Sequence, residues 1–340
     1  MKQVLAALAA LLILPSTASA AGKLPPVPDS WDSAINAEHP LVGRVVRVRD
    51  GTTTTPADLV DAAAAADYVL LGETHDNPDH HALQAWTLRA LAERGRRPAV
   101  AFEMLDADQG RDLRVYLDGT PEDAAGLGAA VGWAERGWPD WAIYRPIGEA
   151  ALAHALPMWP ADVARRIQTR VGRQGFDGAV DAERRTRLGL DEPLGEALRD
   201  NLMADLKRGH CNMLPESALA PMTRVQRLRD AVMADNLMAA AKDSGDGAVL
   251  IAGRGHARAD RGVPWYLRAR LDAPSVLTVG IVEAMAGQTD WRAYLPDAPE
   301  GTPPAFDYLW VTPRFDDTDH CAALRKRMET MRQEHGGTGD

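Results

Sequence analysis

Short apolar runs limit the possible fold of this chain more than any other feature, because in several of them apolar residues do not alternate with polar ones. The runs at 99–102 and 248–252 are continuously hydrophobic, as expected for strands that are buried on both faces of a parallel sheet. Helical patterns such as residues 81–94 lie between them. We predict an α/β fold, a mostly parallel sheet flanked by helices. The predicted strands are 44–48, 67–71, 99–102, 155–159, 248–252, 276–282 and 308–311.

The region from about residue 161 to 244 interrupts this alternation, since it has charge-rich amphipathic patterns and no convincing strand. We interpret it as a helical insertion acting as a lid or subdomain. The predicted organisation is a signal peptide at 1–20, an extended lead-in at 21–40, an α/β domain at 41–315, and a C-terminal helix with a disordered tail at 316–340.

The N-terminus has the features of an export signal. A positive start at Lys2 precedes an apolar run over 4–14, and Ala18-Ser19-Ala20 matches a cleavage site. The run is too short for a membrane span. We therefore expect a periplasmic or secreted protein with its first residue at Ala21. No cysteine near this site is available for a lipid anchor.

The charge balance argues against nucleic acid as a partner. Removal of residues 1–20 takes away Lys2 and changes the formal charge from -10 to -11, whereas nucleic-acid binding needs clustered basic charge. The two cysteines, Cys211 and Cys321, enter an oxidising compartment. Their spacing leaves open whether they pair or stay as buried thiols.

Polar residues follow three of the predicted strands directly. The strand at 67–71 runs into Gly72-Glu73-Thr74-His75, and the strand at 248–252 runs into Gly253-Arg254-Gly255-His256. The same Gly-x-x-His spacing thus occurs twice, and Glu103 follows a third strand. Because ligands bind beyond the carboxyl ends of parallel strands, we predict one shared site.

The residue types at this site permit several chemistries. His75, Glu103 and His256 are suitable ligands for a divalent metal. The same three residues, with Glu73, also suit metal-free activation of water, and a haem is the third possibility. We expect His80 and His81 to lie in the first turn of a helix and face solvent, and Asp76 to assist capping. Asn77 and Pro78 suit the N-cap and first position of that helix.

These motifs resemble the superfamily of Tiki proteases, TraB proteins, erythromycin esterases and ChaN haem-binding uptake proteins, and within it they are most similar to ChaN. The resemblance extends from about residue 67 to 313. It is carried by Leu71–Asn77, Ala101–Met104, Trp141–Ile147, Gln226–Asp230, Ala252–Arg258, Gly262–Pro264 and Asp307–Pro313.

The resemblance implies haem as the ligand, with Tyr144 as the residue that binds the iron and Arg145 and Arg258 as partners of the propionates. His75 and His256 would hold the haem edge, or a second haem across a homodimer. A haem receptor or transport components are the implied protein partners, and peripheral membrane contact is left open. Pro160-Ala161-Asp162 stands where the family pattern leads us to expect an asparagine.

Two functions follow from the sequence. The first is an exported haem-binding protein that takes part in haem or iron uptake or handling. The second is a hydrolase of the Tiki or erythromycin esterase type, cleaving an ester or amide bond with His75, Glu103, His256 and Glu73, with or without a divalent metal. The likeness outside the site favours haem, and the intact pair of Gly-x-x-His motifs favours the enzyme.

Overall fold

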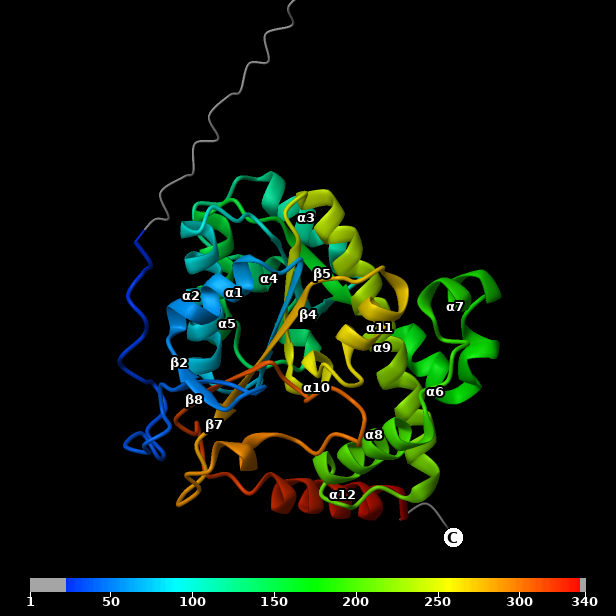
Figure 1. The fold of residues 1–340 in the computed structure, drawn as a ribbon. Helices are drawn as coiled ribbons and strands as arrows, with labels where there is room; N and C mark the ends of the chain where they lie inside the picture. The colour runs from blue at the N-terminus through cyan, green and yellow to red at the C-terminus, as the bar shows by residue number, and fades with distance from the viewer. Residues whose placement is uncertain (1–22, 337–340) are drawn as a thin grey trace, which may run out of the picture.

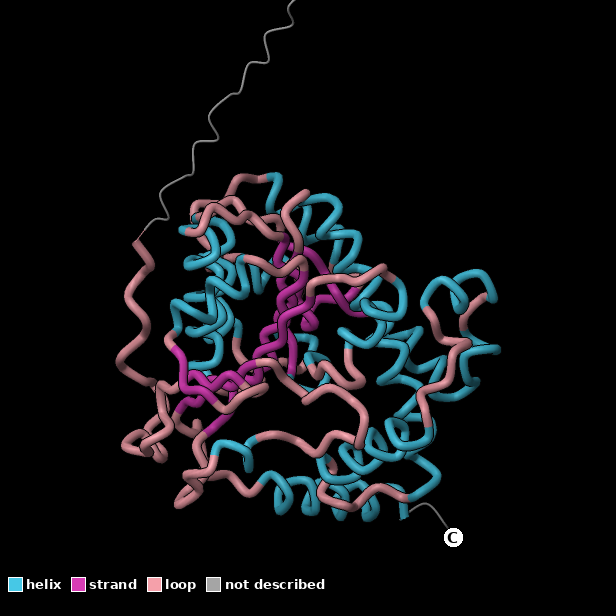
Figure 2. The backbone as a smooth tube through the Cα atoms, viewed as in Figure 1, coloured by secondary structure: helices cyan, strands magenta, loops and turns pink. Residues whose placement is uncertain are grey.

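One mixed sheet runs through the centre of the molecule and is seen nearly edge-on in Figures 1 and 2. The computed structural model describes residues 23–336; the predicted signal peptide and the last four residues of the predicted tail lie outside this range. The described strands form the order β2-β1-β8-β7-β3-β6-β4-β5. They are β1 (Val45–Arg47), β2 (Thr52–Thr54), β3 (Tyr68–Glu73), β4 (Ala99–Asp106), β5 (Met158–Asp162), β6 (Ala248–Gly253), β7 (Val276–Glu283) and β8 (Tyr308–Thr312).

The predicted α/β class is confirmed, since β3 to β8 pair with one another in parallel, and among the described strands the antiparallel pairs are those of β1 with β2 and with β8. Strands β3, β4 and β6 are buried along their whole length. The exposed edge strand β2 was missed, because its three threonines carry no apolar pattern.

The strand predicted at 155–159 is displaced, because β5 covers Met158–Asp162. Residues before it still belong to the end of a helix. The Leu156 amide donates to the Ala151 carbonyl at 2.8 Å, and Ala155 has a positive φ of 52°. The apolar run is therefore divided between a helix end and a strand. As a result Asp162 lies within the sheet.

Two hydrophobic cores cover the two faces of the sheet. On one face α1 (Pro56–Ala64), α2 (Pro78–Glu93) and α5 (Trp141–Ala153) pack over β3, β4 and β6. On the other face α9 (Glu216–Ser244) and α11 (Val263–Arg270) cover the same strands. The remaining helices are α3 (Gly110–Asp118), α4 (Leu127–Ala130), α6 (Arg165–Ala179), α7 (Ala182–Leu188), α8 (Glu196–Gly209), α10 (Arg254–Ala257), α12 (His320–Gly336) and the 3-10 turns η1 (Ala134–Arg136) and η2 (Trp291–Tyr294).

Four helices, α6 to α9, occupy the region of the predicted insertion. The long helix α9 is a layer of the fold, since Leu228, Val232 and Leu237 are buried against the sheet. Helices α6 and α7 lie to the side, away from the strands (Figure 1). The role of this region as a lid stays a prediction.

Helix α2 begins as the sequence predicts. The Asn77 side chain accepts from the backbone amides of Asp79 and His80, and Pro78 is in the first turn. Asn77 also donates to Glu283 Oε1 at 2.8 Å and to the Pro313 carbonyl. The cap therefore ties α2 to the ends of β7 and β8.

Cys211 and Cys321 form a disulfide, which resolves the alternative left open by their spacing. It joins the loop between α8 and α9 to the start of α12, across a sequence separation of 110 residues. The chain-entropy estimate for a loop of this length is about 4–5 kcal/mol of stabilisation. Within residues 23–336, the helices lack the combination of length and hydropathy that a transmembrane span requires.

Candidate functional site

The three predicted strand ends meet because β6 lies between β3 and β4 in the sheet. Glu73 at the end of β3 is level with Gly253 at the end of β6. Glu103 lies in β4, one residue beyond the last paired position beside β6. His75 Nε2 lies 3.9 Å from Glu103 Oε2, and His256 Nε2 lies 3.3 Å from Glu103 Oε1. The two histidines of the repeated motif therefore face one carboxylate.

Glu103 is almost fully buried and is held by donors from three elements. Its Oε1 lies 2.7 Å from an Arg229 guanidinium nitrogen of α9, and its Oε2 accepts the Gly253 amide at 2.7 Å. Burial favours the neutral acid, but His256, Arg229 and His75 outweigh burial and hold the pKa of Glu103 well below its usual value. Glu103 is thus an ionised carboxylate that is satisfied by charged partners.

His256 is clamped between two carboxylates. Its Nδ1 lies 2.6 Å from Asp230 Oδ1, on the side opposite the contact with Glu103. Burial opposes the charged ring, but Glu103 and Asp230 raise the pKa of His256 to about 9. The imidazolium form is therefore the stable one at neutral pH.

Glu73 organises the other half of the site. It is fully buried, and its Oε1 lies 2.9 Å from His75 Nδ1. Burial disfavours the charged imidazole, yet Glu103 and Glu73 raise the pKa of His75. Gly253 permits this arrangement, because a Cβ at that position would lie 2.8 Å from His75 Nε2.

His80 and His81 do not face solvent as predicted, because both are completely buried under the loop that carries His75. His81 Nδ1 lies 3.2 Å from Glu73 Oε2, and its Nε2 lies 3.1 Å from the His75 carbonyl oxygen. His80 accepts the Thr74 amide at 2.9 Å, and burial lowers its pKa well below the usual value. Helix α2 starts beneath the site, so its first turn faces the sheet edge.

Tyr144, the predicted iron ligand, lies behind Glu73 and His75 and is completely buried. Its hydroxyl is 3.1 Å from Glu73 Oε1 and 3.1 Å from the His75 carbonyl oxygen. Burial and the Glu73 carboxylate raise the pKa of Tyr144 far above the ordinary value. In this structure the phenol is therefore a neutral partner of Glu73, and its role as an iron ligand stays a prediction.

The two predicted propionate partners lie in different surroundings. Arg145 is on the exposed side of α5 and pairs with Glu149 at 2.6 Å. Arg258 is buried, and its donors are taken by Asp205 at 2.8 Å and by Asp260 at 2.6 Å. Arg258 thus binds the α8 segment to the loop after β6. The half-exposed Arg145 pairs with Glu149 through its Nε alone among the described residues, and the role of both arginines as propionate partners stays a prediction.

Sequence reasoning assigned no role to Arg229, Asp230 and Asp162. Arg229 bridges Glu103 and Asp162, with 2.8 Å to Asp162 Oδ2. Gln226, whose amide lies 3.0 Å from His256 Nδ1, is four residues before Asp230. Arg229 and Asp230 follow Gln226 at positions i+3 and i+4, so the three side chains lie on one face of α9. This spacing is the sequence pattern from which their shared location could have been predicted.

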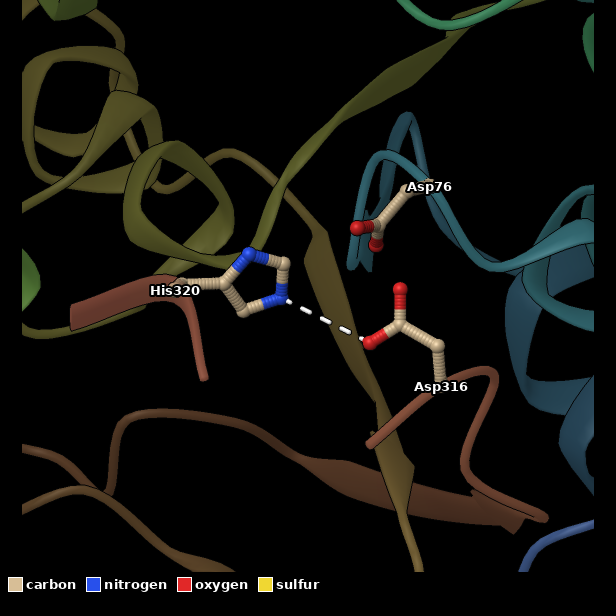
Figure 3. Close-up of side chains that lie close together, drawn as sticks. All are labelled: Asp76, Asp316 and His320. Carbon is tan, nitrogen blue, oxygen red and sulfur yellow. Dashed lines mark ion pairs between the residues drawn. The ribbon is translucent and has the colours of Figure 1, made fainter. Parts of the chain in front are cut away.

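One group of potential metal ligands occurs among the described residues, and it is not the predicted set. Asp76, Asp316 and His320 bring one ligand atom each to within 4.8 Å of one another (Figure 3). His320 Nε2 lies 3.7 Å from Asp316 Oδ1. The divalent-ion site at His75, Glu103 and His256 stays a prediction. Asp76 does not cap α2, since Asn77 does.

A comparison with models of known protein families assigns this chain to a family. A family model described as "Haem-binding uptake, Tiki superfamily, ChaN" matches residues 59–267. The chain belongs to this ChaN family. The match includes both Gly-x-x-His motifs, Glu103 and the α9 residues of the site. A comparison with curated proteins finds no match.

One solved structure supports the fold. The ChaN family member of Campylobacter jejuni, described with cofacial haem binding, is 18% identical, with a TM-score of 0.58 over 78% of this chain and 95% of its own. The type III effector HopBA1 is 15% identical with a TM-score of 0.40, covering 81% and 99% of the two chains. An erythromycin esterase, EreC, is 13% identical with a TM-score of 0.35, covering 74% and 78%. Identity this low shows fold alone, and only the first score supports even that.

The clamp around His256 predicts how stability depends on pH. The pKa of about 9 in the folded protein lies above the usual histidine value of 6.5, so the imidazolium stabilises the fold fully below pH 6.5 and this contribution is lost as pH rises through 9. The shift corresponds to about 3 kcal/mol. We expect urea unfolding to show a fall in stability between pH 6.5 and 9.5 that is much smaller in His256→Gln. An equal dependence of unfolding free energy on pH in the two proteins would contradict a charged His256 held between Glu103 and Asp230.

Proposed function

We propose that this ChaN family member binds haem at the carboxyl ends of β3, β4 and β6. The observation that carries the proposal is the exposure of His75. Its side chain is 34% exposed, whereas those of Glu73, Glu103 and His256 are 0%, 2% and 6% exposed. Imidazole is a common axial ligand of haem iron, and family membership supports haem as the ligand.

The surroundings of His75 fit this ligand. The ring packs on Trp138 with centroids 5.0 Å apart, and Glu73 fixes the ring through Nδ1. A carboxylate partner on the second nitrogen orients an imidazole ligand and increases its basicity. Tyr144 was the predicted iron ligand and His75 was predicted to hold the haem edge. The geometry favours His75 as the ligand, because Tyr144 is buried and its phenol resists ionisation.

A haemin titration of residues 21–340, followed by visible absorption, tests the proposal. We expect saturable binding that weakens at least tenfold in His75→Ala, because the exposed ring is lost. Tyr144→Phe removes one hydroxyl behind Glu73 and should leave the ferric spectrum unchanged.

Three other outcomes of the haemin titration would contradict part or all of the proposal. Loss of a tyrosinate-type spectrum in Tyr144→Phe would restore Tyr144 as the ligand. Binding that is indifferent to both substitutions would move the haem away from this edge. The absence of saturable binding would overturn the proposal.

We also propose that the protein is exported and acts in haem or iron uptake. The Cys211–Cys321 disulfide supports an oxidising compartment, and residues 1–20 supply the predicted signal. When the full chain is expressed in a Gram-negative bacterium, the purified protein should begin at Ala21 and be released with the periplasmic fraction. A protein that begins at Met1 in the cytoplasm would contradict export.

Hydrolysis of an ester or amide is the second candidate, and one observation favours it. His75 and His256 converge on the ionised Glu103, an arrangement suited to general acid–base chemistry. A screen with p-nitrophenyl esters and chromogenic amides, with and without Zn²⁺ or Mn²⁺, should then give turnover that falls at least hundredfold in Glu103→Gln and His75→Ala. Turnover equal in these variants and the parent would reject the site as catalytic.

A further inference from the structure

Arg254, the residue between Gly253 and Gly255 in the second motif, differs from the arginines predicted to bind propionates. Arg145 and Arg258 have ion-pair partners. Arg254 is only partly exposed, and within the range 23–336 its guanidinium has neither a hydrogen-bond partner nor an ion-pair partner. A guanidinium carries five donors, so Arg254 has donors available for a ligand.

Arg254 lines two neighbouring cavities at the carboxyl edge of the sheet. The smaller has a volume of about 320 Å³ and is lined by polar and charged groups together with the apolar side chains of Leu295, Pro296 and Phe306. The larger, about 610 Å³, lies between the end of β7 and the segment that follows β8. The side chain thus lies where two spaces open for a ligand.

Among the charged residues that line the smaller cavity, Arg254 carries a positive charge that no neighbouring carboxylate pairs with. Its other charged lining residues, Asp205 and Arg258, pair with each other at 2.8 Å. Arg258 is bound further by Asp260, and Arg261 also pairs with Asp205. Burial lowers the pKa of the Arg254 guanidinium, an effect that the Glu283 and Glu73 carboxylates partly offset. An anion is the group that would satisfy this cation.

Arg254 also adjoins the site described above. It directly follows Gly253, whose backbone lies against the His75 ring and donates to Glu103. The Arg254 Cα itself lies 3.1 Å from the position of a Cβ on Gly72. The His75 ring and Arg254 thus both adjoin Gly253, the last residue of β6.

We propose that Arg254 binds the carboxylate of an apolar ligand in the smaller cavity, and that in the haem complex this carboxylate is a propionate. The second part rests on the proposed function. Leu295, Pro296 and Phe306 would contact the apolar part of such a ligand, and guanidinium pairs with carboxylate through two parallel hydrogen bonds. Arg254 thus takes the role that the sequence assigned to Arg145 and Arg258.

The test compares haemin with haemin dimethyl ester, whose propionates carry no charge. Both are titrated into the parent protein, Arg254→Gln, Arg254→Lys and the control Arg292→Gln, an exposed arginine paired with Asp290 on η2. We expect Arg254→Gln to bind haemin ten- to hundredfold more weakly, the usual effect of losing a charged hydrogen-bonded partner. Arg254→Lys should recover part of the affinity. The ester should bind the parent and Arg254→Gln equally, and Arg292→Gln should match the parent.

Thermal unfolding of each variant confirms that it is folded before titration. Equal haemin affinity in the parent and Arg254→Gln would overturn the inference while leaving haem binding intact. So would an equal loss for haemin and its ester. If the parent binds no haemin, the proposed function fails, and calorimetric titration with hexanoate tests the cavity by itself. Hexanoate binding that disappears in Arg254→Gln would then support the carboxylate site, and no binding would reject it.

Discussion

The ionised carboxylate of Glu103 is the constraint on which the rest of the site depends. A buried charge at a strand end is tolerated only with charged partners. Arg229 supplies one from α9, His256 supplies another from the segment after β6, and the Gly253 amide completes the set. Since these groups come from separate elements, their contacts with the Glu103 carboxylate attach α9 and α10 to the end of β4. Removing the carboxylate would leave Arg229 with Asp162 and His256 with Asp230.

A second carboxylate, Glu73, has a separate set of partners, so the carboxyl edge of the sheet contains two clusters, one around Glu103 and one around Glu73. Its oxygens face His75, His81 and the Tyr144 hydroxyl, all of them supported by α2 and α5. Around Glu103, His256 and the Gly253 amide are buried and Arg229 is mostly buried, so this part of the edge supports the fold. Around Glu73 one partner, His75, reaches the surface beside Trp138. A rigid carboxylate that orients a partly exposed imidazole is the usual support for a ligand of iron, and it equally suits a general base. The same geometry therefore serves both candidate functions.

The arginines show why chemical type alone does not identify a binding residue. Arg258 stands in the motif and has the right charge, but its donors are saturated by Asp205 and Asp260. In the part of the chain that the structure describes, Arg254 has the same charge and no such partners. The difference arises from α8, which brings Asp205 to Arg258 and not to Arg254. The insertion thereby influences which cation at the sheet edge is left for an anionic ligand.

The sequence by itself determined the parallel sheet, the positions of its main strands, the Asn77 cap and the meeting of His75, Glu103 and His256. These follow from local apolar runs and from the rule that parallel strands end at one edge. Only the tertiary structure decided that Tyr144, His80 and His81 are buried, that β5 begins at Met158 and that Cys211 pairs with Cys321. It also decided that, among the described residues, Arg258 has ion-pair partners and Arg254 has none. Each of these depends on contacts between segments far apart in the chain. Local pattern carries no record of such contacts, because burial and ion pairing are set by which helix packs over which strand.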